Sequence, residues 1–131
     1  MKTIIALILT LGFVTNIFAQ ADKYETAMQD ALQLIENQEK ADLQQAANTF
    51  ERIASVATDE WLPRYYEGLS HVYLAGIAAN DSDWEAYEQH LDKAQAAVKA
   101  AKLKTSSNSE LTVLQAYIYQ GRIWKNPMIR G

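Results

Sequence analysis

Apolar residues recur at intervals of three and four along the chain from residue 22 onward, and this spacing constrains the fold most. It places apolar side chains along one face of a helix. No alternating strand pattern competes with it after the first 21 residues, and the sequence holds only five glycines and two prolines. We therefore expect an all-α fold of five helices, over Asp22–Gln38, Asp42–Ala57, from the cap signal Thr58-Asp59 to Ala79, Trp84–Leu103 and Ser109–Lys125.

Short polar segments separate these helices, so neighbouring helices are expected to be antiparallel. Two of the segments carry start signals. Ser82 with Glu85, and Ser107 with Glu110, have the spacing of a capping box, in which the Ser and Glu side chains each accept a backbone N–H. The spacing predicts helix starts beside both serines.

The first residues have the pattern of a secretory signal peptide. Lys2 is followed by about a dozen apolar residues from Ile4, and small residues lie around Ala19. The apolar run is short for a membrane span, which needs about 20 residues, although an uncleaved membrane anchor is the alternative. We expect a leader over 1–19, cleavage near Ala19, and a periplasmic or secreted domain over 20–131 without a stable membrane span.

The absence of cysteine excludes a disulfide framework, a thiolate metal site and a Cys nucleophile. Other catalytic patterns are also missing from the sequence. His71 and His90 belong to no His-Glu-x-x-His or Glu-x-x-His motif, and there is no Gly-x-Ser-x-Gly or glycine-rich phosphate loop. We expect both histidines, and also Glu67 and Glu88, at the surface or at a groove edge. The chain is not expected to be an enzyme or to hold a metal or cofactor.

Charge is unevenly distributed behind a formal net charge of −4. Residues 20–92 hold 15 acidic and 4 basic residues, whereas residues 93–131 hold 1 acidic and 7 basic residues. The basic end either complements the acidic part within the fold or steers an acidic partner or anionic lipid; nucleic acid is disfavoured. The candidate basic patch consists of Lys99, Lys102, Lys104, Arg122, Lys125 and Arg130.

Aromatic residues are numerous for a domain of this length, and they belong either to the core or to a concave binding wall. Tyr65 and Tyr119 lie partly off the main apolar stripes. We therefore expect a partner-binding groove lined by Trp61, Tyr65, Tyr66 and Tyr119.

Helical patterns repeat along the chain. Tyr66, Leu69 and Tyr73 have the same spacing as Leu111, Leu114 and Ile118, 45 residues later. With the segments at 46–54, 60–66 and 117–128, this pattern resembles tetratricopeptide-like repeats, and more closely exported tetratricopeptide-like proteins of Gram-negative bacteria. The resemblance implies antiparallel helix pairs in a right-handed array or a small bundle. It also implies a non-catalytic scaffold that binds a protein or peptide in the cell envelope.

Two departures qualify the resemblance. The repeat spacing is 42 to 45 residues rather than about 34, and the fifth helix has no following partner helix. We expect a shortened, C-terminally incomplete member that can associate with itself through the fifth helix. The alternative function is a small-ligand or lipid carrier that uses the apolar interior between helices.

Overall fold

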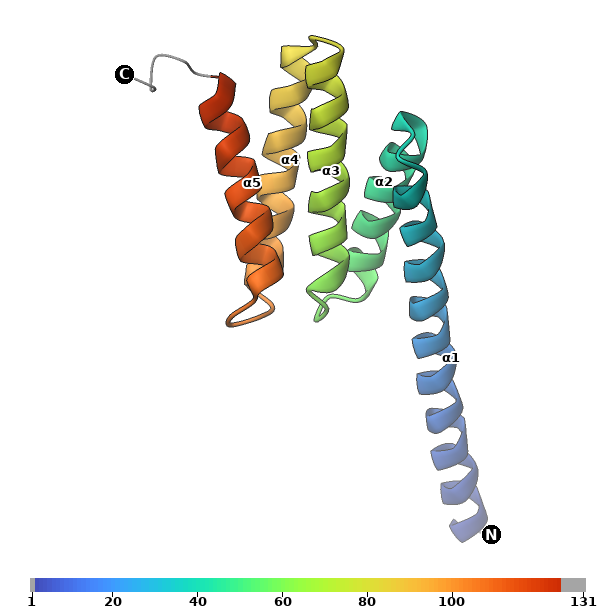
Figure 1. Cartoon of the computed structure of the whole chain (residues 1–131). Coiled ribbons are helices and arrows are strands. Elements are labelled where there is room, and N and C mark those ends of the chain that lie inside the picture. Colours follow the sequence, from blue (N-terminus) through green and yellow to red (C-terminus); the bar gives the residue numbers. More distant parts are fainter. Residues whose placement is uncertain (1, 126–131) are drawn as a thin grey trace.

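The computed structural model describes the backbone of residues 2–125 and the side chains of residues 19–124. This part of the chain forms five α-helices and no strand, which confirms the expected all-α class (Figure 1). The helices are α1 (Lys2–Asn37), α2 (Lys40–Val56), α3 (Leu62–Asn80), α4 (Trp84–Lys102) and α5 (Ser109–Lys125).

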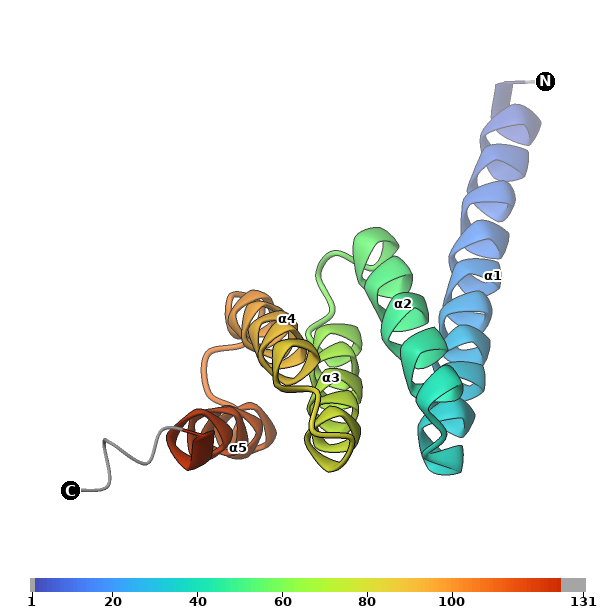
Figure 2. The ribbon, with the colours of Figure 1, turned by 90° about the horizontal axis from the view of Figure 1, so that it is seen from above.

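The helices form an open array in which each helix packs against the next one in the sequence. From above, α3 and α5 lie side by side with α4 packed behind them, while α2 and α1 continue the array on the other side of α3 (Figure 2). Contact between α3 and α5 closes a three-helix unit with α4. The central helix α3 therefore contacts neighbours on both sides.

The core is divided into clusters along this array. One cluster joins α1 to α2 through buried Met28, Ala31, Ala46 and Phe50. A second cluster lies among α3, α4 and α5, where alanines allow close helix approach and larger residues fill the space between helices; its buried members are Ala94, Val98, Ala101, Leu111, Leu114 and Ile118. A third, smaller cluster joins α3 to the first half of α4 through Ala75, Ala78, Tyr87 and Leu91.

The first helix begins at Lys2 rather than at Asp22, so the expected leader and the expected first helix form one continuous helix. Its only glycine is Gly12, and it contains no proline that would interrupt it. The side chains of residues 1–18 lie outside the described residues, so the signal peptide stays a prediction. Among the residues whose side chains are described, no helix is both long and apolar enough to cross a membrane.

Two expected caps and one expected helix start are wrong, although α4 and α5 begin at Trp84 and Ser109 as expected. Asp83 caps α4, because its Oδ1 accepts the N–H of Ala86 at 3.0 Å. Asn108 caps α5 in the same way, accepting the N–H of Leu111 at 3.0 Å. Each cap is one residue after the serine of the expected capping box. The third helix begins at Leu62, after Trp61, and not at the Thr58-Asp59 signal.

Candidate binding surface

A ladder of aromatic rings surrounds the start of α3. Phe50 of α2 stacks on Tyr66 with ring centroids 5.3 Å apart. Tyr66 meets Tyr65 edge-on at 5.0 Å, and Tyr65 meets Trp61 edge-on at 6.0 Å. The structure therefore brings together three of the four residues expected to line a groove.

These three residues also join two parts of the core. Tyr66 packs against the α1–α2 cluster, whereas Tyr65 and Trp61 pack against the cluster among α3, α4 and α5. All three are partly exposed. Since each ring has one side in the core and one side in solvent, its orientation is fixed while part of its surface stays accessible.

Burial raises the pKa of the Tyr65 phenol, and nearby Tyr66, Glu110 and Tyr73 raise it further. Tyr65 therefore keeps its proton at neutral pH and can donate a hydrogen bond. Glu110 belongs to the first turn of α5. The end of this surface next to α5 thus combines a phenol donor with a carboxylate acceptor.

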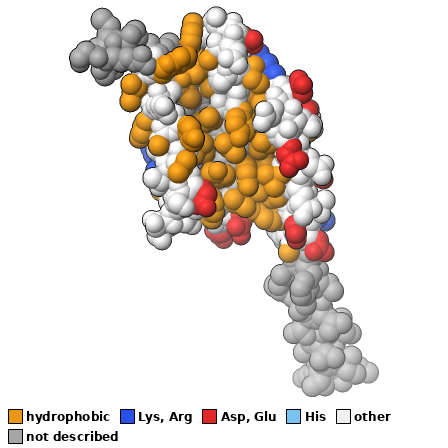
Figure 3. All heavy atoms as spheres, viewed as in Figure 1, with side chains coloured by type: hydrophobic (Ala, Val, Ile, Leu, Met, Phe, Trp, Pro, Cys, Tyr) orange, Lys and Arg blue, Asp and Glu red, His pale blue; other side chains and the backbone are white. Residues whose placement is uncertain are grey.

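The apolar surface continues along α3. Leu69 is partly buried, and Tyr73, one turn further, is 39% exposed. Hydrophobic side chains gather over α3 and its neighbours on this side of the molecule, while acidic side chains lie along the α1 edge (Figure 3). We call Trp61, Tyr65, Tyr66, Leu69 and Tyr73 the α3 aromatic face.

Tyr119, the fourth expected groove residue, is not part of the aromatic ladder. It lies on α5, is exposed, and makes none of the ring contacts of the α3 ladder. At about 100° per residue, Tyr119 is rotated by about 100° from Ile118, which is buried against the core. The sequence placed Tyr119 outside the core stripe but did not show which side of α5 it would occupy.

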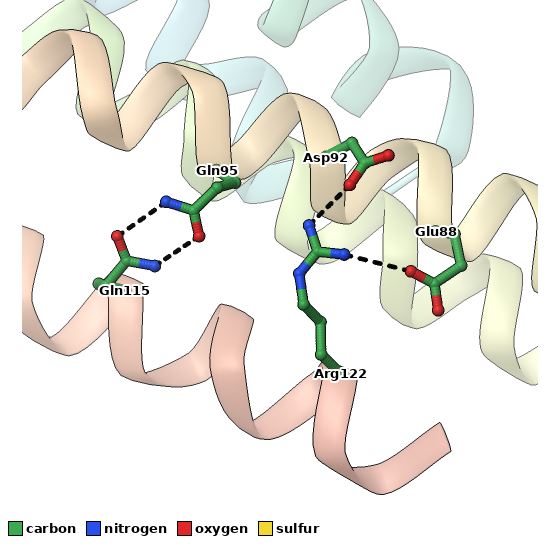
Figure 4. A network of polar contacts seen from close by, with 5 residues as sticks. All are labelled: Glu88, Asp92, Gln95, Gln115 and Arg122. Carbon is green, nitrogen blue, oxygen red and sulfur yellow. Dashed lines mark hydrogen bonds and ion pairs between the residues drawn. The ribbon is translucent and has the colours of Figure 1, made fainter. Parts of the chain in front are cut away.

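The candidate basic patch is divided in the structure. Lys99, Lys102 and Lys104 are exposed at the end of α4. Arg122 instead pairs with Asp92 at 2.7 Å and Glu88 at 3.3 Å, in the first half of α4 (Figure 4). The Lys125 side chain and Arg130 lie outside the described residues. For Arg122, basic charge complements acidic charge within the fold, which was one of the two expected roles.

A second polar contact beside this pairing also fixes α5 on α4. Gln95 Nε2 donates to Gln115 Oε1 at 2.9 Å, and Gln115 Nε2 donates to Gln95 Oε1 at 2.6 Å (Figure 4). Gln115 is buried, so this reciprocal amide pair satisfies polar groups that could not all reach water. Together the two contacts fix both the axial position and the rotation of α5.

The expected surface positions of His71 and Glu67 are wrong, because both side chains are buried. The Nδ1 atoms of His71 and His90 lie 3.2 Å apart, and their rings stack with centroids 5.4 Å apart. Burial, followed by nearby His90 and Lys93, lowers the pKa of His71 to about 4. Both residues were missed because α3 packs on two sides, whereas one apolar stripe was assumed to mark its only buried face.

Burial also lowers the pKa of His90, and the charges of Lys93 and Lys40 lower it further. Glu67 keeps a charge partner, since Arg64 Nη1 lies 2.7 Å from its Oε2. Burial nevertheless raises the Glu67 pKa, and the Arg64 contact only partly opposes that shift. Within the described part of the chain, no group of three or more His, Cys, Asp or Glu residues is placed to hold a metal ion.

Comparisons with family models, curated proteins and solved structures find no match to this chain. The function proposed below is therefore inferred from the chain's own residues and their arrangement.

Proposed function

We propose that this protein is an exported, non-catalytic helical scaffold of tetratricopeptide-like type that binds a protein or peptide in the cell envelope. The observation that carries the proposal is the α3 aromatic face. The rings of Trp61, Tyr65 and Tyr66 pack against the core and remain partly exposed. Tyr and Trp are enriched at protein interfaces because they offer a large apolar surface together with a polar group.

The rigidity of this face favours binding. A flexible side chain loses rotamer freedom when a partner immobilises it, and that loss opposes association. Tyr65 and Tyr66 are already restrained by edge-on contact with each other, and Tyr66 by stacking on Phe50. We expect the partner to insert apolar or aromatic side chains along α3 and to hydrogen-bond the Tyr65 phenol.

Two sequence features support the other parts of the proposal. The spacing shared by residues 66–73 and 111–118 fits a repeat whose units pack on their sequence neighbours, as the helices of this array do. The short apolar run behind Lys2 supports export.

The test is partner capture by a Tyr73→Ala variant. Tyr73 is 39% exposed, so removal of its ring should reduce capture of a specific envelope protein at least several-fold without unfolding the chain. Trp84→Ala is the matched control, because Trp84 is 40% exposed but begins α4. Equal capture by wild type and both variants would contradict the assignment to the α3 aromatic face.

The alternative is carriage of a small ligand or lipid in the apolar interior, and it predicts a bound molecule in native mass spectrometry of the purified protein. A hollow of about 330 Å³ lies on α5, lined by Tyr117, Gln120, Gly121 and Trp124. All four residues come from one helix, so this hollow does not enclose a ligand. We therefore prefer the scaffold.

A further inference from the structure

The outward side of α5 carries no charged residue between Glu110 and Trp124. The one charged residue in this stretch, Arg122, pairs with side chains of α4 instead. We define the α5 outer face as the eight exposed residues Thr112, Val113, Ala116, Tyr117, Tyr119, Gln120, Ile123 and Trp124. Its five large apolar or aromatic members are between 52% and 61% exposed. Apolar residues exposed to this degree on one helix form a patch of the kind that marks an interaction site.

The opposite side of α5 is fully used within the array. Leu111, Leu114 and Ile118 are buried against α3 and α4. Gln115 and Arg122 are paired with side chains of α4 (Figure 4). These contacts fix the rotation of the helix, so the α5 outer face points away from the rest of the described molecule.

The outward sides of α4 and α1 are different. On α4 they carry exposed Glu85, Lys93, Lys99 and Lys102. On α1 they carry exposed Asp22, Lys23, Glu25, Asp30 and Glu36. Depletion of charge together with enrichment of Tyr and Trp distinguishes the centre of a protein interface from ordinary surface. By this criterion the α5 outer face has the composition of an interface centre, whereas the outward sides of α1 and α4 have the composition of ordinary solvated surface.

We propose that the α5 outer face binds the same face of a second copy of this chain, forming a two-fold symmetric dimer. In a two-fold contact, residues near the axis meet their own counterparts. An uncharged face can meet itself without like-charge repulsion and without burying a charge. A head-to-tail contact of α5 with α1 would instead cover the exposed carboxylates of α1, so the symmetric contact is favoured.

The centre of the face suits close pairing. Ala116 and Gln120 lie one turn apart, flanked by larger residues on both sides. The small Ala116 side chain allows the two helices to approach. Gln120 can form with its counterpart the reciprocal amide pair that Gln95 and Gln115 already form within one chain.

The area is sufficient for a modest specific dimer. Aromatic side chains cover roughly 150–250 Å² each, so the exposed parts of this face amount to about 500 Å² per copy. A two-fold contact that covered the whole face in both copies would bury about 1,000 Å² in total, the lower bound for a specific interface.

The test compares two glutamate variants of the protein expressed from its full-length coding sequence. Ala116→Glu places two carboxylates beside the proposed axis, and Ala96→Glu is the control, since Ala96 is also exposed but lies on α4. Molar mass is measured by sedimentation equilibrium over a concentration series and divided by the chain mass from denaturing mass spectrometry. Far-UV circular dichroism checks that both variants keep their helices.

We expect a mass ratio approaching two for wild type and Ala96→Glu. For Ala116→Glu we expect a ratio near one, with the dimer dissociation constant raised about 100-fold or more by the paired charges. A wild-type ratio of one at every concentration would overturn the proposal. A ratio of two for Ala116→Glu would overturn it as well, because another surface would then hold the dimer together.

Discussion

The imidazoles of His71 and His90 face each other across the α3–α4 contact, with their Nδ1 atoms 3.2 Å apart. When both rings are neutral, one Nδ1–H can donate to the other Nδ1. When both rings are charged, they repel each other, and Lys93 adds to the repulsion. Asp83 acts in the opposite direction on His90: its negative charge raises the pKa of that ring, but less than Lys93 and Lys40 lower it. The pair is therefore stable mainly in its neutral state.

This arrangement predicts a loss of stability in mild acid. The pKa of His71 is about 4 in the folded chain and 6.5 as the ordinary value, so below pH 6.5 the unfolded chain binds a proton that the folded chain does not. The stabilisation that the buried neutral His71 ring gives the folded chain is present above pH 6.5 and is lost as the pH falls toward 4. Between pH 7 and pH 5 we expect the free energy of unfolding to fall by about 2 kcal/mol from this group, measured by urea denaturation.

His71→Gln is the informative variant for this prediction. Glutamine can still hydrogen-bond to His90 but does not titrate. The variant should lose clearly less stability than wild type over the same pH interval, because other groups titrate equally in both proteins. An identical pH dependence in the two proteins would assign the acid sensitivity to other residues.

At the scale of the element, helices were the most predictable feature of this sequence. Apolar spacing located α2, α4 and α5 closely, because each presents one broad buried side to the array. The capping residues were less predictable. In Ser82-Asp83 and Ser107-Asn108, two adjacent residues are both good caps, and only the backbone decides between them. Ser82 has a φ of 58°, which removes it from the cap position and leaves Asp83 there.

Helix contacts also depend on which glycines face a neighbouring helix, and the spacing of apolar residues does not show this. A Cβ on Gly121 of α5 would lie 2.7 Å from the Tyr87 hydroxyl and 3.3 Å from Leu91 Cδ1, both on α4. A Cβ on Gly76 of α3 would meet nothing within 4 Å. The first glycine permits a close helix approach, and the second occupies an exposed helix position where alanine fits.

Alanine substitutions at these two glycines should therefore have opposite effects. Gly76→Ala should raise the free energy of unfolding by about 0.5–1 kcal/mol, because glycine loses more backbone freedom in a helix. Gly121→Ala should lower it by about 1 kcal/mol, because overpacking outweighs the same gain. Both are measured by urea denaturation. If adding Tyr87→Phe does not relieve the loss in Gly121→Ala, the Tyr87 hydroxyl is not its cause.

At the scale of the whole molecule, the sequence predicted the class of the fold but not how the core is divided. The apolar stripes of α1 and α5 look alike in sequence, yet they belong to clusters on opposite sides of α3. The proximity of Trp61, Tyr65 and Tyr66 was predictable, because they are close in sequence and their rings contact one another in space. The position of Tyr119 was not predictable from the sequence, since it depends on the rotation of α5, which the Gln95–Gln115 and Arg122 contacts set.

An array whose helices contact mainly their sequence neighbours need not unfold as a single unit. Phe50 belongs to the α1–α2 cluster and Leu114 to the cluster among α3, α4 and α5; both are buried. Each alanine variant should lose about 2–5 kcal/mol of local stability. In hydrogen exchange, Phe50→Ala should lower protection chiefly in residues 24–56, and Leu114→Ala chiefly in residues 84–122. A uniform loss over all five helices in either variant would instead show that the Tyr65–Tyr66 contact couples the two clusters into one cooperative unit.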